Sequence, residues 1–185
     1  MILFRPNDGI DTIIESNCWP KLLADRRDKL ILKTINSIFN IEAEGLQLLP
    51  SGEFMVMFDE YSIPLDSMGD GTRAAMRALM CLAMVEKTLF LMEEPECHQH
   101  PAALEALARG MCAIAKKRGI QILLTTHSME CIRAFRKATL ESESTFAVHH
   151  LSLNDGIQTA RRLSGDALDS LDDGGIDVRY ADLYV

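Results

Sequence analysis

Residues 89–96 read LFLMEEPE, an apolar run that ends in two adjacent glutamates, Glu93 and Glu94. A short apolar run that stops at charged residues is typical of a buried strand in a parallel sheet. Open sheets of this kind bind ligands at the carboxyl ends of their strands. Hydrolysis of a nucleotide needs one carboxylate to hold Mg²⁺, usually through water, and another to orient or deprotonate the attacking water. The two glutamates suit these tasks, and the alternative is a pair of solvated loop charges.

The elements around this strand predict an α/β fold with a mixed, largely parallel sheet flanked by helices. A strand at 88–92, a helix at 101–117 and a strand at 120–125 form a crossover unit, which should be right-handed and covered on both faces. Before this unit, the sequence predicts an amphipathic helix at 20–39 opened by Pro20, antiparallel strands at 46–49, 54–58 and 61–64, and a core helix at 72–86. After it, the sequence predicts a helix at 128–137, a hairpin of strands at 145–153 and 156–162, and a tail from Leu163 with a short helix and a loosely held ending.

A serine and two glycines precede the core helix, in the segment LDSMGDGTR at residues 65–73. Backbone amides at a helix amino terminus form an anion site, and glycine lets a phosphate approach the main chain. Ser67, Gly69 and Gly71 are therefore candidate phosphate contacts. The alternative is an ordinary loop and helix cap.

A histidine, His127, follows the strand at 120–125 and should lie at the same sheet edge as Glu94. A lone histidine in that position is more often a structural hydrogen-bonding group. The acidic strand end, the glycine-rich loop and the histidine loop could each act on a phosphate. Their order and spacing in the sequence nevertheless favour nucleotide chemistry.

These motifs resemble those of a known superfamily. SMGDG before an apolar helix, LFLMEEPE followed by His100-Pro101, and GIQILLTTHSMECIRAF resemble the signature loop, Walker B strand, D-loop region and switch-histidine strand of ABC-type ATPases. Within that superfamily the chain is most similar to the SMC/RecF/OLD-like AAA-family ATPases, and it looks like their carboxy-terminal half. The resemblance covers residues 63–135 and continues more weakly through the hairpin LSLNDGIQTARRL.

The resemblance implies a role for each matching residue around ATP and Mg²⁺. Glu93 would be the acid associated with Mg²⁺ through water, Glu94 the catalytic base, and His127 the γ-phosphate sensor.

The resemblance also implies a head-to-tail dimer, because in these ATPases the signature loop completes the site of the opposite subunit. Ser67, Gly69 and Gly71 would contact the γ-phosphate of the nucleotide held there. Residues 97–100 would form the D-loop region that touches the partner.

Two departures from the family pattern stand out. Glu93 occupies the position where the Walker B acid is usually aspartate. No GxxxxGK[ST] segment occurs, and nothing before Ile63 replaces it. Without that loop the β- and γ-phosphates and Mg²⁺ lose most of their ligands, so we expect the chain alone to bind ATP poorly and to hydrolyse it hardly at all. The family's first strands should be missing too, which leaves a sheet edge and apolar surface unpaired.

Composition sets limits on partners and location. The 185 residues fit one domain, with a helix and strand meander at 1–62, the motif-bearing core at 63–165 and a tail at 166–185. The net charge of −8 gives no reason for a broad basic surface, so nucleic acid would be engaged only indirectly.

The five cysteines are odd in number and dispersed, which indicates reduced thiols in the cytoplasm. No signal peptide or membrane span is predicted. A zinc site in ECHQH at 96–100 is disfavoured because it lacks a second ligand pair.

Two functions remain after this reading. The first is half of a split or truncated ATPase that a P-loop-bearing partner or a missing amino-terminal half completes, in DNA repair or phage defence. The second is a non-catalytic pseudo-ATPase module for protein association, for example as a homodimer. For either function, this sequence could also be part of a longer protein that begins further upstream.

Overall fold

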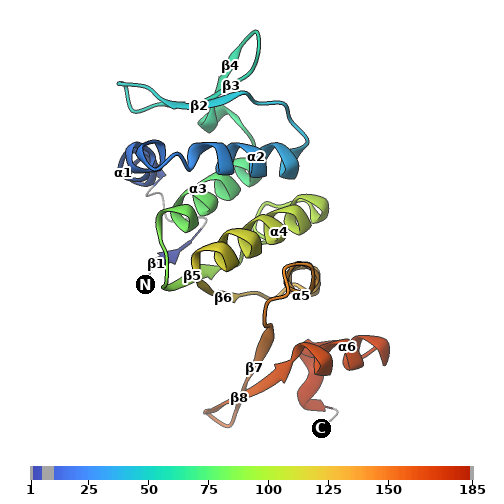
Figure 1. Cartoon of the computed structure of the whole chain (residues 1–185). Helices are drawn as coiled ribbons and strands as arrows, with labels where there is room; N and C mark the ends of the chain where they lie inside the picture. The colour runs from blue at the N-terminus through green and yellow to red at the C-terminus, as the bar shows by residue number, and fades with distance from the viewer. Residues whose placement is uncertain (1, 6–10, 184–185) are drawn as a thin grey trace.

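A parallel sheet of three strands positions the residues described above. The computed structural model describes residues 2–5 and 11–183, which Figure 1 shows as ribbons. Strands β1 (Ile2–Phe4), β5 (Leu89–Glu93) and β6 (Gln121–Thr125) pair in the order β1-β5-β6. The predicted α/β fold with a parallel sheet is confirmed. The parts of the predicted amino-terminal segment and tail that fall on residues 1, 6–10 and 184–185 lie outside the described residues.

Helix α4 (Pro101–Arg118) is the predicted crossover helix between β5 and β6. Pro101 occupies the first turn, where its missing N–H has no partner to lose. The His100 side chain caps the helix by accepting the backbone N–H of Ala102 at 3.3 Å. Gly119 ends it with a φ of 64°, which glycine adopts without strain. Local signals at both ends therefore fix this helix.

The amino-terminal region forms two helices rather than the single one predicted at 20–39. Helix α1 (Asp11–Ala24) contains Pro20 in its interior, and α2 (Asp28–Phe39) begins after a turn in which Arg26 has a φ of 57°. The prediction that Pro20 opens a helix is wrong. Trp19 and Leu22 on either side of it are buried, and this packing outweighs the local preference of proline for a helix start.

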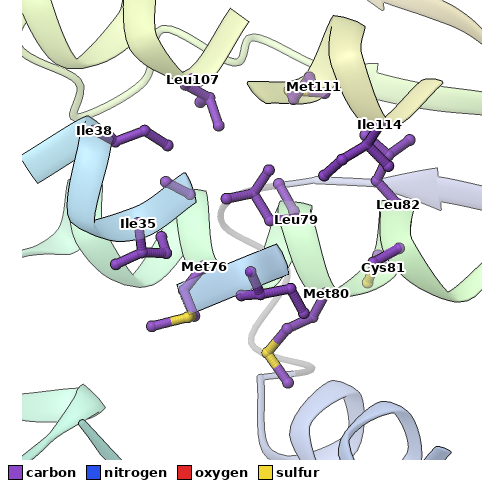
Figure 2. Close-up of a cluster of buried hydrophobic side chains, with 14 of the residues drawn as sticks. Ile35, Ile38, Met76, Leu79, Met80, Cys81, Leu82, Leu107, Met111 and Ile114 are labelled. Carbon is purple, nitrogen blue, oxygen red and sulfur yellow. The ribbon is translucent and has the colours of Figure 1, made fainter. Parts of the chain in front are cut away.

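Helix α3 (Asp70–Met84) runs through the centre of the core, as its apolar composition predicted. Every residue from Ala74 to Ala83 is buried. Figure 2 shows the packing of its side chains against α2 and α4, with Met76, Leu79 and Met80 from α3, Ile35 and Ile38 from α2, and Leu107, Met111 and Ile114 from α4. The loop that precedes α3 is therefore joined to a helix whose position is fixed by core packing.

The antiparallel strands form sheets of their own. Strands β2 (Gly45–Leu48), β3 (Phe54–Met57) and β4 (Ser62–Pro64) make the predicted meander. Its Phe54 ring packs edge-on against Trp19 of α1, with the ring centroids 4.9 Å apart. Strands β7 (Ala147–Asn154) and β8 (Ile157–Ser164) make the predicted hairpin, whose turn residues Asp155 and Gly156 both have positive φ.

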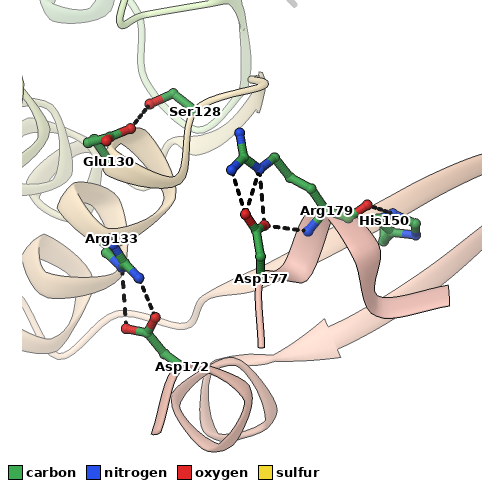
Figure 3. Close-up of polar contacts among 7 residues, drawn as sticks. All are labelled: Ser128, Glu130, Arg133, His150, Asp172, Asp177 and Arg179. Atoms are coloured by element: carbon green, nitrogen blue, oxygen red, sulfur yellow. Dashed lines mark hydrogen bonds and ion pairs between the residues drawn. The ribbon is translucent and has the colours of Figure 1, made fainter. Parts of the chain in front are cut away.

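The tail contains the predicted short helix but is held more firmly than the sequence predicted. Helix α6 (Gly165–Asp173) and the short helix η2 (Val178–Leu183) follow the hairpin, and Leu163, Leu168 and Val178 form a small buried cluster. Arg133 of α5 (Met129–Glu141) pairs with Asp172, as Figure 3 shows. These contacts join segments far apart in the chain, so no local pattern reveals them.

One face of the parallel sheet stays partly open within the described residues. Leu3, Leu91 and Leu123 stand in register across the three strands, and we call them the leucine row. Leu3 is 49% and Leu123 53% exposed, whereas Phe90 and Met92 on the opposite face are buried. In the described part of the chain β6 pairs only with β5. The described residues thus leave an edge and an apolar surface of the sheet open, so the expected cover on both faces is wrong. That this opening results from missing first strands stays a prediction.

Three of the five cysteines, Cys81, Cys112 and Cys131, are buried and act as small apolar residues. All five are free thiols. Burial raises the pKa of Cys112 to about 11 and that of Cys131 to about 12, which keeps both protonated at neutral pH. None of the helices in residues 11–183 has both the length and the apolar character needed to cross a membrane.

Gly110 of α4 lies where α2 leaves room for no side chain. A methyl group at this position would come within 2.4 Å of Thr34 Cγ2. We expect Gly110→Ala to lower the free energy of unfolding by about 1–3 kcal/mol through overpacking. Thr34→Ser removes Cγ2 but keeps the hydroxyl that donates to the Leu30 carbonyl at 2.8 Å, so the double variant should recover most of the loss. Urea unfolding followed by circular dichroism measures both effects, and a double variant no more stable than Gly110→Ala would contradict this packing explanation.

Candidate functional site

The carboxyl ends of β5 and β6 bring the two acidic residues and the histidine loop to one edge of the sheet. Glu93 stands in register with Thr125. The pairing continues one residue further, because the backbone N–H of Glu94 donates to the Thr125 carbonyl at 3.0 Å. His127 follows two residues later, and the side chains of Glu94 and His127 are both exposed. Both are thus accessible to a ligand at this edge.

A left-handed backbone turn sets the position of Glu94. Its φ is 44°, a conformation that costs a residue other than glycine roughly 1–3 kcal/mol and that is concentrated at functional sites. The Cys97 N–H closes the turn on the Glu94 carbonyl at 3.0 Å. The Cys97 thiol contacts Glu94 Oε2 at 3.5 Å, and its pKa is raised first by burial and then by this carboxylate. Cys97 is therefore a thiol beside Glu94 and not a thiolate.

The loop that carries His127 is hydrogen-bonded on both sides. The Thr126 hydroxyl donates to Glu96 Oε1 at 2.5 Å and accepts the backbone N–H of Ser128 at 3.0 Å. The Ser128 hydroxyl caps α5 by accepting the N–H of Cys131 at 3.2 Å and donates to Glu130 at 2.9 Å, the second contact being drawn in Figure 3. The loop after β6 is thus tied to the loop after β5.

The glycine-rich loop is fixed at its start by burial and charge. It begins in a short helix, η1 (Leu65–Ser67), whose Leu65 is buried. The carboxylate of Asp66 pairs with the buried Arg77 guanidinium at 2.9 Å. Ser67 and Gly69 are exposed, and Gly69 occupies the N-cap position of α3, where its side of the loop is open.

A close contact joins the glycine-rich loop to the loop after β5. The Gln99 side chain donates to the Gly71 carbonyl at 2.8 Å. A Cβ at Gly71 would lie 2.5 Å from the His98 carbonyl oxygen, so only glycine fits there. The sequence predicted these segments separately, and the structure shows that they touch.

Two aspartates flank the predicted anion site, and their negative charges would repel a phosphate if they were unpaired. Arg73 lies between them: it pairs with Asp70 and lies 3.7 Å from an oxygen of Asp66. Together with Arg77 it compensates both carboxylates. The exposed Ser67 and Gly69 thus lie beside carboxylates whose charge is compensated.

One residue of this edge is not detectable from sequence. Arg5 directly follows β1, and its Nε lies 3.0 Å from Glu93 Oε2. A strand of three residues gives no periodic signal, and an isolated arginine beside it carries no motif. Only the pairing of β1 with β5 brings the two residues together.

The side chains present fit part of a magnesium site. Mg²⁺ is usually held by one or two carboxylates together with substrate phosphates and water, and Glu93 is one such carboxylate. Within the described residues no group of three or more His, Cys, Asp or Glu side chains is arranged to hold a metal alone.

A hollow of about 500 Å³ lies elsewhere, between α2 and β2, and none of the predicted site residues lines it.

Comparisons with known proteins place the chain among ATPases. Residues 8–132 match the family model described as AAA ATPase domain. A protein of Methanocaldococcus jannaschii, "Uncharacterized protein MJECL11", is 29% identical over 65 residues, which cover 35% of this chain and 57% of that protein. The match therefore spans just over half of the length of this curated relative.

Two solved structures share the fold of this chain. One comes from work on ATP-driven dimerization and DNA-stimulated activation of SMC ATPases; it is 14% identical, with a TM-score of 0.53, and the match covers 85% of this chain and 98% of that one. The other is the Smc head domain of Pyrococcus furiosus with an extended coiled coil, bound to the C-terminal domain of ScpA; it is 13% identical, with a TM-score of 0.54, and the match covers 80% of this chain and 37% of that one. At these identities the similarity concerns the fold.

Gly71 and Gly69 offer a matched pair for testing the contact between the loops. A Cβ at Gly71 meets the His98 main chain, whereas one at Gly69 meets no atom within 4 Å. We expect Gly71→Ala to lower the free energy of unfolding by about 1–3 kcal/mol and to speed amide hydrogen exchange at residues 96–100. Gly69→Ala should cost less than about 1 kcal/mol and leave that exchange unchanged. Equal exchange in the two variants would show that the loops do not depend on each other.

Proposed function

This chain belongs to the AAA ATPase domain family, as its motifs predicted, and we propose that it is the carboxy-terminal half of an ATPase head that hydrolyses ATP with Mg²⁺ once a P-loop is supplied. The P-loop would come from a complementary chain or from a segment outside this sequence, since no GxxxxGK[ST] occurs here. Its fold is similar to that of SMC ATPase heads.

The connection among three loops supports this proposal most. Thr126 ties the histidine loop to Glu96, and Gln99 ties the same segment to Gly71. An ordinary surface loop has no need of such coupling. A site that must align a base, a phosphate sensor and an anion-binding loop does need it, because small misplacements in a catalytic site cost orders of magnitude in rate.

Each residue has a distinct role in this proposal. Glu93 would hold Mg²⁺ through water, Glu94 would orient or deprotonate the attacking water, and His127 would contact the γ-phosphate. The exposed Ser67 and Gly69, with Gly71, would contact the γ-phosphate of a nucleotide held by an opposite subunit. Bound Mg²⁺ would supply charge neutralisation at the β- and γ-phosphates.

The open sheet supports the need for a partner. Within the described residues, the leucine row and the outer edge of β6 leave apolar surface and unpaired backbone groups exposed, a combination that natural sheets usually cover. A P-loop-bearing segment that adds a strand at β6 would cover both. A complementary chain would supply that segment, whereas a second copy of this chain, which has no GxxxxGK[ST], would associate as a homodimer without supplying it.

DNA repair or phage defence remains the proposed setting. A structurally similar chain comes from work on ATP-driven dimerization and DNA-stimulated activation of SMC ATPases. The net charge of −8 favours an indirect contact of this chain with nucleic acid.

A non-catalytic association module is the second candidate. Glutamate in place of aspartate at the Walker B position, and the ion pair that this glutamate forms with Arg5, favour it. In such a module the same open sheet would bind a partner without turnover.

Replacement of the proposed base separates the two functions. We expect Glu94→Gln to reduce ATP hydrolysis by the reconstituted head at least about 100-fold, because a general base contributes roughly that factor or more. The exposed Glu42 offers a matched control, and Glu42→Gln should leave the rate unchanged. Phosphate release from the co-purified complex measures both rates. Hydrolysis that persists in Glu94→Gln, or that is absent in the unaltered complex, would favour the association module.

Replacement of one leucine in the row tests the proposed partner surface. Leu123→Asp places a charge on the open face, and we expect it to weaken association at least about tenfold. Covering the exposed half of Leu123 contributes roughly 1–1.5 kcal/mol, and burying an unpaired carboxylate in its place costs more. Leu140→Asp is the control, because Leu140 is 58% exposed on α5 and outside the row. Sedimentation velocity of the mixed chains reports association. A similar loss in both variants would exclude a specific role for the row.

A further inference from the structure

The ion pair between Arg5 and Glu93 links the amino-terminal strand to the proposed metal acid. Parallel pairing places Phe4 in register with Met92, so the residues that follow are neighbours at the carboxyl edge. Arg5 Nε lies 3.0 Å from Glu93 Oε2, and the two side chains are 46% and 43% exposed. The pair is thus accessible to ions in solution.

The guanidinium neutralises the carboxylate that the proposed function assigns to Mg²⁺. A carboxylate next to an arginine has less attraction for a second cation, because the two positive charges repel and share the same oxygens. Among the described residues, the basic side chain paired with Glu93 is Arg5, and Glu93 itself stands in register with Thr125 and adjoins Glu94.

We propose that Arg5 is a positioning residue that holds Glu93 in the absence of metal and competes with a divalent cation for its carboxylate. The proposal rests on the role of Glu93 in the proposed function. It does not depend on hydrolysis. Arg5 therefore sets how readily this edge of the sheet accepts a metal ion before any nucleotide is turned over.

Manganese binding to the full chain tests the competition. Mn²⁺ substitutes for Mg²⁺ and broadens amide resonances close to it, so a titration followed by ¹⁵N NMR locates and ranks binding at residues 92–94 and 125. We expect Arg5→Gln to increase the Mn²⁺ affinity at these residues about two- to fivefold, the factor that corresponds to an exposed ion pair. Arg5→Lys should stay close to the unaltered chain, and Glu93→Gln should abolish the broadening.

A second arginine controls for net charge. Arg109 is 43% exposed and pairs with Glu105 on α4, so Arg109→Gln removes the same charge from another place. An equal gain in Arg109→Gln, no gain in Arg5→Gln, or no broadening at this edge in any variant would overturn the proposal. These results are independent of the Glu94→Gln rates, so failure of the competition and failure of the ATPase proposal are separable.

Discussion

The parallel pairing of β5 with β6 is the constraint on which the whole site depends. Because both strands run in the same direction, Glu93 and Thr125 end at one edge, and the two loops leave the sheet side by side. An antiparallel β6 would carry His127 to the opposite end of a strand of this length, about 16 Å away. The crossover helix α4 is what makes the parallel arrangement possible, so its capping residues are indirectly part of the site.

Backbone geometry, more than side-chain chemistry, determines how the loops meet. The left-handed turn at Glu94 reverses the chain directly after the strand and sends residues 96–100 toward α3. Gly71 allows that segment to approach the start of α3, because its missing Cβ leaves space for the His98 carbonyl. This contact and the hydrogen bond from Thr126 to Glu96 link the acidic segment to the glycine-rich and histidine-bearing segments.

The sequence predicts elements that local signals specify and misses those that only packing specifies. The strand 89–93, helix α4 and the turn at Asp155-Gly156 all carry periodicity, caps or turn residues within a few positions. Strand β1 is too short for any pattern, and α1 continues through Pro20 because its neighbours are buried. The candidate site residues are predicted from motif order, whereas the place of Arg5 beside Glu93 depends on a pairing between distant parts of the chain.

The magnitude of the exposed apolar surface indicates how the head would assemble. Leu3 and Leu123 are each about half exposed, so covering them would stabilise a complex by roughly 2–3 kcal/mol in total. Association of two chains costs an estimated 4–15 kcal/mol in lost translational and rotational freedom. The leucine row alone therefore cannot hold a partner. The rest would have to come from strand pairing along the outer edge of β6, which has no partner within the described residues.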